Sequence, residues 1–191
     1  MNKRKFDNVY QFKIVLRDTD PPVWRRIQVP ETYTFWELHV AIQDAMGWED
    51  YHLHEFTLKN PSNGVEADIG IPDEEGDFDD DMLAGWEQKI AEWFSIENNK
   101  ADYMYDFGDG WEHDIILEKI LPCDKNIKYP ICIDGARACP PEDCGSIPGY
   151  EEICQGKHEF QEHYKDFRPE YFNPKEVFFD NPKERLKLRL D

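Results

Sequence analysis

The sequence has no long apolar run, no visible leader and few positive charges. No hydrophobic stretch approaches the roughly 20 residues of a membrane-spanning helix. The start of the chain, residues 1–5, leads into a mixed polar segment and does not look like a signal peptide. Basic residues number 22 against 41 acidic ones, which gives a net charge of −19. Such a surface repels phosphate backbones and anionic lipids, so we expect a cytoplasmic protein with no duplex nucleic acid or membrane partner.

Common catalytic and cofactor motifs are also missing. The chain has no phosphate-binding loop, no dinucleotide-binding glycine pattern and no serine elbow. Asp106-Phe107-Gly108 matches the metal-binding triplet of protein kinases. The glycine-rich loop and catalytic-loop motifs of kinases are absent, so this match does not indicate a kinase. The five cysteines, an odd number, indicate free thiols or metal ligands rather than a disulfide framework. A divalent metal is the one cofactor that remains to be considered.

What is present is typical of a globular protein with an aromatic core. The chain has 191 residues, of which 40% are hydrophobic and 14% aromatic. This length suits one domain, 1–191. We expect its core at about 8–121. The segment 122–191 begins with an irregular loop rich in proline and cysteine and continues as helical pieces, which we expect to pack on that core.

The apolar patterns predict an α+β fold. A capping box at Thr34 and Glu37 starts a helix that stops at Gly47, and a second helix is expected near 80–96, after an acidic loop at 73–81. Alternation predicts strands at 9–16, 23–29, 53–58, 102–107 and 111–121. The order β-β-α-β-α-β-β suits a mixed or antiparallel sheet with helices on one face, like a β-grasp or an α/β-roll.

The most informative segment is a predicted hairpin at 103–113. Tyr103, Tyr105 and Phe107 should share one face, and Gly108-Asp109-Gly110 supplies the tight turn. Three ionisable groups, Asp106, Asp109 and His113, could bind a divalent cation that keeps an open position for water. The alternative, which the residue types favour more, is a structural turn whose aspartate caps backbone amides.

Two further groups carry ligand chemistry. His52 and His54 would share a face if both were on a strand, which is good geometry for a late transition metal, although two ordinary histidines are more frequent. Cys139 and Cys144 have four residues between them, whereas zinc sites more often use two such pairs with shorter gaps. A compact loop whose thiols pack inward is therefore the more common outcome at these cysteines.

Three ordered motifs resemble one known family. They read Trp36-Glu37-Leu38-His39 through Ala45-Met46-Gly47-Trp48 with His52-Leu53-His54-Glu55-Phe56, then Tyr105-Asp106-Phe107-Gly108-Asp109-Gly110-Trp111-Glu112-His113, and Ala138-Cys139-Pro140-Pro141-Glu142-Asp143-Cys144-Gly145. Together they are similar to the Ri-plasmid ORF-three-like family over about residues 8–180. The resemblance implies an α+β fold and no established activity.

Some members of that family carry a transposon-passenger or resolvase-like label. A serine recombinase needs a nucleophilic serine among arginines and a basic DNA-binding module. The three serines here, at 62, 95 and 146, lie near no arginine cluster, and the net charge is −19. We therefore do not transfer that activity to this chain.

Two functions from different classes remain. The favoured one is a non-enzymatic module that binds a protein, a peptide or a small ligand through the aromatic and acidic hairpin and the Cys-Pro-Pro loop. The alternative is a metal-dependent enzyme, most plausibly a hydrolase, in which a carboxylate acts as general base. The candidate metal ligands are His54, Asp106, Asp109 and His113, with Cys139 and Cys144 as weaker ones. The other candidate binding residues are Tyr105, Trp111, Glu142 and Asp143.

Overall fold

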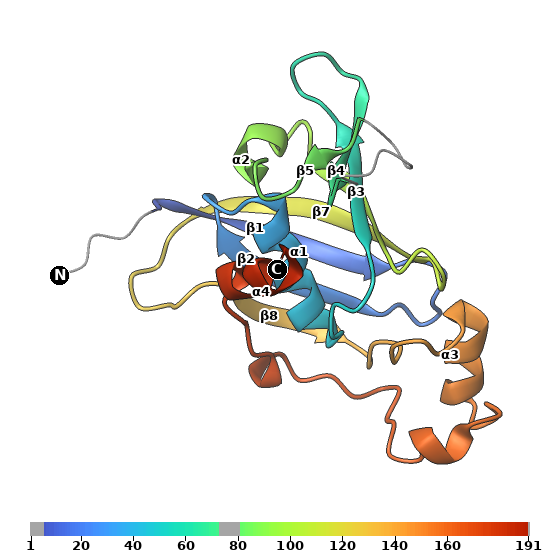
Figure 1. Cartoon of the computed structure of the whole chain (residues 1–191). Helices are drawn as coiled ribbons and strands as arrows, with labels where there is room; N and C mark the ends of the chain where they lie inside the picture. Colours follow the sequence, from blue (N-terminus) through green and yellow to red (C-terminus); the bar gives the residue numbers. More distant parts are fainter. Residues whose placement is uncertain (1–5, 73–80, 191) are drawn as a thin grey trace.

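The computed structural model describes residues 6–72 and 81–190, which form an α+β fold around an eight-stranded sheet (Figure 1). The strand order is β5-β4-β3-β6-β7-β1-β2-β8, and each neighbouring pair is antiparallel except β4 and β5. The strands are β1 (Asn8–Leu16), β2 (Trp24–Pro30), β3 (His54–Lys59), β4 (Glu66–Gly70), β5 (Leu83–Ala84), β6 (Lys100–Tyr105), β7 (Trp111–Pro122) and β8 (Ile131–Ala136).

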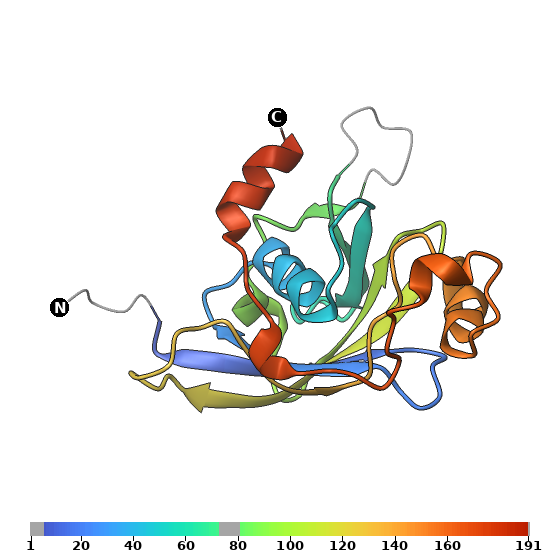
Figure 2. The same ribbon diagram turned by 90° about the horizontal axis from the view of Figure 1, so that it is seen from below.

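The sheet curls around the first helix, as Figure 2 shows. The helices are α1 (Phe35–Met46), α2 (Ile90–Trp93), α3 (Ser146–Cys154) and α4 (Pro182–Leu190), with short 3-10 turns at Gln161–Tyr164 and Pro174–Glu176. The predicted α+β fold class is confirmed. Among the described residues, no helix has the length and the apolar character needed to cross a membrane.

Helix α1 forms where its sequence predicted. The Thr34 hydroxyl accepts a hydrogen bond from the Glu37 amide, and the Glu37 carboxylate accepts one from the Thr34 amide, so the capping box is complete. Gly47 ends the helix with φ 98°, a conformation that costs glycine little. Phe35, Leu38 and Ile42 are fully buried against the sheet, and this apolar face holds the helix in place.

The β6–β7 hairpin is also present, but its turn is longer than predicted. Tyr103 and Tyr105 are buried on one face of β6, as expected from alternation. The strand then ends at Tyr105, and Asp106 adopts φ 55°, so Phe107 leaves the tyrosine face and is 51% exposed. The prediction that Phe107 would share that face is therefore wrong, because period-two alternation does not continue through a turn.

The helix predicted near 80–96 is wrong except for one turn, α2. Leu83 instead pairs with Ile69 in a short parallel bridge between β5 and β4. The Gly85 amide donates to the Gly70 carbonyl, so the chain passes close to the sheet edge where helical backbone could not lie. The predicted acidic loop at 73–81 lies outside the described residues except for Asp81. Strands β4, β5 and β8 were not predicted.

The segment after β8 contacts the sheet and α1. The Arg185 guanidinium of α4 lies 2.7 Å from the Asp44 carboxylate of α1. The Trp36 indole donates a hydrogen bond to the Pro182 carbonyl. Arg25, which is 1% exposed, donates to the Ala45 carbonyl near the end of α1 and stacks on Phe172. These contacts fix the C-terminal segment beside α1.

Candidate functional site

Three loops meet at one end of the β6–β7 hairpin. They are the β6–β7 turn (residues 106–110), the Cys-Pro-Pro loop (139–145) and the segment between α1 and β3 (47–53). Glu142 joins the Cys-Pro-Pro loop to the end of β6 and to the segment before β3, because its Oε1 accepts hydrogen bonds from the Tyr105 hydroxyl at 2.9 Å and the Glu49 amide at 2.8 Å.

Two further hydrogen bonds tie the same loops together. The Trp48 indole donates to the Pro140 carbonyl, and the Gly145 amide donates to the Asp109 carboxylate at 3.1 Å. The hairpin turn and the Cys-Pro-Pro loop therefore form one continuous surface with the segment that precedes β3.

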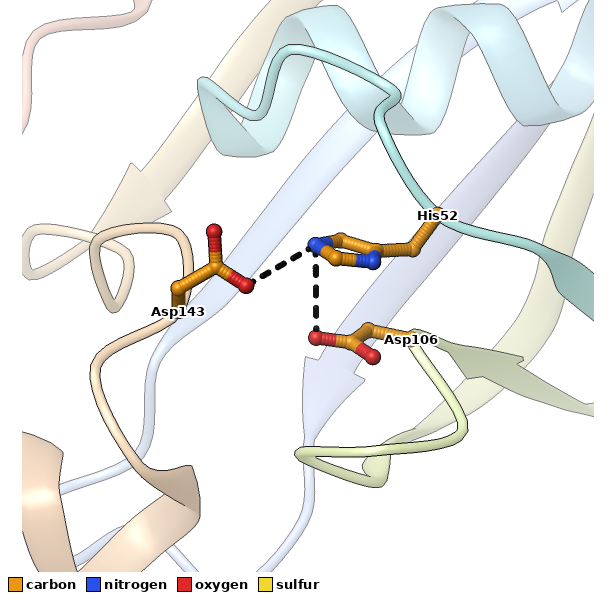
Figure 3. Close-up of side chains that lie close together, drawn as sticks. All are labelled: His52, Asp106 and Asp143. Carbon is orange, nitrogen blue, oxygen red and sulfur yellow. Dashed lines mark ion pairs between the residues drawn. The ribbon is translucent and has the colours of Figure 1, made fainter.

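Each of these loops contributes one ionisable side chain to a compact group, the rim triad of His52, Asp106 and Asp143 (Figure 3). The His52 Nε2 lies 3.1 Å from Oδ1 of Asp143 and 3.6 Å from Oδ2 of Asp106. One ligand atom from each residue lies within 4.8 Å of the other two. The donor set, one imidazole and two carboxylates, is of a kind that holds divalent cations in proteins.

The rim triad is fixed at its base and open at its edge. The Asp106 side chain is 8% exposed, whereas those of His52 and Asp143 are 30% and 70% exposed. Asp106 Oδ1 accepts a hydrogen bond from the Gly108 amide, which orients the carboxylate so that Oδ2 faces the imidazole. Both aspartates have a left-handed backbone, with φ 55° and φ 51°. Such residues cost about 1–3 kcal/mol each and gather at functional sites.

The rim triad lies within a larger acidic cluster. With Asp109 and Glu142, the β6–β7 turn and the Cys-Pro-Pro loop together contribute four carboxylates, and none of the four forms an ion pair with a lysine or arginine of the described residues. Burial raises the pKa of Glu142, and the neighbouring Asp143 raises it further. The Glu142 Oε2 is itself buried and accepts no hydrogen bond from any of the described residues.

Two predicted ligands, His54 and His113, lie in the core and not in this cluster. The His54 ring stacks on His39 with centroids 3.4 Å apart, and burial lowers the pKa of both. His113 is fully buried between Trp48 and Tyr103, and burial lowers its pKa to about 4. The structure therefore does not bring either imidazole to Asp106.

The expected face shared by His52 and His54 is absent, because β3 begins only at His54. The preceding residues form an irregular segment that is held by hydrogen bonds from the Glu49 and Tyr51 amides. Alternation does not apply there, and the two imidazoles diverge. Nothing in the local sequence distinguishes His52 from His54 as a ligand, so the sequence alone does not identify His52 as the member of the site.

The other candidate residues have structural roles in the described chain. Tyr105 and Trp111 are fully buried, so neither offers a surface to a ligand. None of the five cysteines, all of which lie among the described residues, forms a disulfide. Burial raises the pKa of Cys144 to about 12 and also raises that of Cys139, so both thiols stay protonated at neutral pH. Neither cysteine belongs to the rim triad. This fits the alternative of a compact loop whose thiols pack inward.

Two cavities elsewhere do not contain the rim triad. One, of about 550 Å³, has aromatic side chains in its lining, among them Tyr33, Trp86 and Tyr129. The other, of about 640 Å³, lies between the end of α1 and residues 171–180. The acidic cluster is therefore a surface feature and not the floor of either cavity.

Comparisons with known proteins agree with this fold. The chain has a TM-score of 0.83 and 45% sequence identity with the crystal structure of a protein of unknown function, MM3350, from Methanosarcina mazei Go1, over 92% of this chain and 100% of that one. It is 36% identical over 152 residues to the uncharacterized protein y4hQ of Sinorhizobium fredii (strain NBRC 101917 / NGR234), covering 78% of this chain and 72% of the relative.

A family model also matches most of the chain. The match covers residues 8–181, which include all three motifs found in the sequence and every member of the rim triad. The chain therefore belongs to the family described as plasmid pRiA4b ORF-3-like protein.

Proposed function

We propose that this protein is a non-enzymatic binding module that takes a positively charged ligand at the surface formed by the β6–β7 turn and the Cys-Pro-Pro loop. The observation that carries the proposal is the set of four carboxylates, Asp106, Asp109, Glu142 and Asp143, which no lysine or arginine of the described residues neutralises. Packed carboxylates repel one another, so a cation that enters between them is stabilised.

Exposed apolar side chains beside the cluster support a ligand larger than a single charge. Tyr51 is 62% exposed, Leu53 is 48% exposed and Phe107 is 51% exposed. Leu53 is adjacent to the rim triad, because its carbonyl accepts a hydrogen bond from the Asp106 amide. An acidic centre with an apolar border suits a lysine- or arginine-bearing segment, or a cation held together with such a segment.

The test is calorimetric titration of the purified chain with a panel of cationic probes. The panel contains a lysine- and arginine-rich peptide, spermine and divalent metal ions, and a peptide of the same length rich in glutamate is the control. We expect at least one cationic probe to bind with a defined stoichiometry and the acidic peptide not to bind.

A matched pair of double variants separates a site from general charge attraction. Asp109→Asn with Asp143→Asn removes two charges from the cluster, and Glu66→Gln with Glu159→Gln removes two from exposed positions elsewhere. We expect the first pair to weaken binding by about tenfold or more and the second by less than twofold, which is the effect of net charge alone at physiological salt. Equal losses in both, or no binding by any cationic probe, would refute the proposal.

The alternative, a metal-dependent hydrolase, stays a prediction. It would be favoured over the binding module by metal-dependent turnover of an activated ester or phosphate ester that Asp143→Asn abolishes.

A further inference from the structure

We propose that the cation held by the rim triad is a divalent first-row transition metal, bound through His52 Nε2, Asp106 Oδ2 and Asp143 Oδ1. This inference rests on the proposed function, since it names the cation. It goes further in assigning three specific ligand atoms and in excluding the cysteines and the core histidines from the metal site.

The two distances from the His52 nitrogen to the carboxylate oxygens are close to those around one bound metal ion. Two atoms bound at about 2.1 Å to the same metal lie roughly 3.0 Å apart at right angles and roughly 3.4 Å apart in tetrahedral geometry. The observed separations from the His52 Nε2 are 3.1 Å to Asp143 and 3.6 Å to Asp106. One ion can therefore be placed between the three atoms with small side-chain movements.

The orientation of the lone pairs gives an independent argument. His52 Nε2 is buried, yet it forms no hydrogen bond with either carboxylate or with any other group of the described residues. Asp106 is more than nine-tenths buried, and the hydrogen bond from the Gly108 amide reaches Oδ1 and leaves Oδ2 toward the imidazole. Groups that are close without being bonded to each other can direct their lone pairs at a shared point, as metal ligands do.

The donor types indicate the class of metal. An imidazole nitrogen disfavours Mg²⁺ and Ca²⁺, which prefer all-oxygen sites, and suits zinc, iron, nickel and copper. Among the described residues, no cysteine sulfur belongs to this group of ligand atoms, so the softer metals that thiolates select are not favoured. Three protein ligands with a 30% exposed histidine leave positions open for water or for a ligand atom. We therefore choose Zn²⁺ as the probe, and Co²⁺ as its spectroscopic substitute.

The experiment is calorimetric titration of metal-free protein with Zn²⁺, beside Mg²⁺ and Ca²⁺. We expect one Zn²⁺ per chain and at least tenfold weaker binding of the other two ions. His52→Gln should weaken Zn²⁺ binding by about 100-fold, because it removes a direct ligand. His163→Gln, which changes an exposed histidine outside the site, and Glu159→Gln, which removes an exposed carboxylate outside the site, should each change it by less than threefold.

A second variant and a spectrum make the test of the metal site independent of whether His52→Gln folds. Asp143→Asn changes a 70% exposed side chain, so it should fold even if His52→Gln does not, and it should also lose Zn²⁺ affinity. Co²⁺ should give weak visible bands typical of nitrogen and oxygen ligands, without the intense thiolate-to-metal band of a cysteine site. A thiolate band, several Zn²⁺ ions per chain, or equal losses in Glu159→Gln and Asp143→Asn would overturn the assignment.

The outcomes also separate this inference from the proposed function. If Zn²⁺ does not bind but the basic peptide or spermine binds and depends on Asp143, the metal assignment fails and the binding module stands. If no cation binds, both fail.

Discussion

His52 and His54 are two positions apart in the chain and lie in different regions of the molecule. His52 belongs to the rim triad, 30% exposed beside two carboxylates. His54 belongs to the core histidines, which are His39, His54 and His113, packed around Tyr103. The imidazole is thus accessible to solvent and ligands at position 52 and buried away from water at position 54.

The difference arises from what surrounds each ring. At the rim, loops supply charged partners and leave an edge open to solvent. In the core, the β-sheet and α1 enclose the rings, and the partners are buried as well. The Tyr103 hydroxyl lies 2.9 Å from His39 Nδ1, the Asp50 carboxylate lies 2.9 Å from His39 Nε2, and the Tyr103 carbonyl lies 3.3 Å from His113 Nδ1. We infer that the rim triad can be changed at little cost in stability, whereas the core histidines cannot.

Acid should produce the largest effect, mainly through the core histidines. Burial lowers the pKa of His113 to about 4, below the ordinary 6.5 of an unfolded chain, and lowers the pKa of His39 and His54 as well. The unfolded state therefore binds these protons first. The stability contribution is complete above about pH 6.5 and is lost as the pH falls toward 4, by about 3 kcal/mol for His113 alone.

Urea denaturation at pH 7 and at pH 4.5 measures this loss. The raised pKa of Asp50, which faces His39, opposes part of it, because that carboxyl takes up a proton more readily in the folded state. His52→Gln should retain the same acid sensitivity as the unchanged protein. A free energy of unfolding that stays constant between these pH values would break the distinction between the two regions.

Tyr103→Phe should have the next largest effect, a loss of about 2 kcal/mol in the free energy of unfolding. The Tyr103 hydroxyl is hydrogen-bonded to the His39 ring and accepts from the Gln43 amide, so its removal leaves two buried polar groups without a partner. Tyr171→Phe is the matched control, since the Tyr171 hydroxyl donates to an exposed carboxylate. This substitution should lower the free energy of unfolding by less than about 0.5 kcal/mol. Equal effects would mean that the core hydrogen bonds contribute no more than exposed ones.

His52→Gln should have the smallest effect on folding, within about 0.5 kcal/mol of the unchanged protein when no metal is added. Its ring is partly exposed and makes no hydrogen bond through Nε2. Thermal unfolding followed by circular dichroism, with and without Zn²⁺, measures both properties. We expect Zn²⁺ to stabilise the unchanged protein and not this variant. A loss of more than about 2 kcal/mol without metal would place His52 among the structural histidines.

Local patterns predicted the elements whose signals lie within one segment. The capping box at Thr34 and the glycine at position 47 set both ends of α1, because caps depend on residues a few positions apart. The hairpin at 103–113 followed from alternation and its turn glycines. Strand β5, only two residues long, was mistaken for part of a helix, because its backbone is extended by pairing with β4 and not by its own sequence.

The sequence by itself determined the α+β class, the capped helix, the hairpin, the acidic character and the family. It also indicated Asp106 as a candidate metal ligand and Asp143 as a candidate binding residue. Only the tertiary structure decided that His52, and neither His54 nor His113, lies beside those carboxylates. The reason is that 37 positions separate Asp106 from Asp143, and their approach depends on β8 and on contacts such as the Tyr105–Glu142 hydrogen bond. No pattern within one segment of the sequence predicts that residues so far apart in the chain lie close together in space.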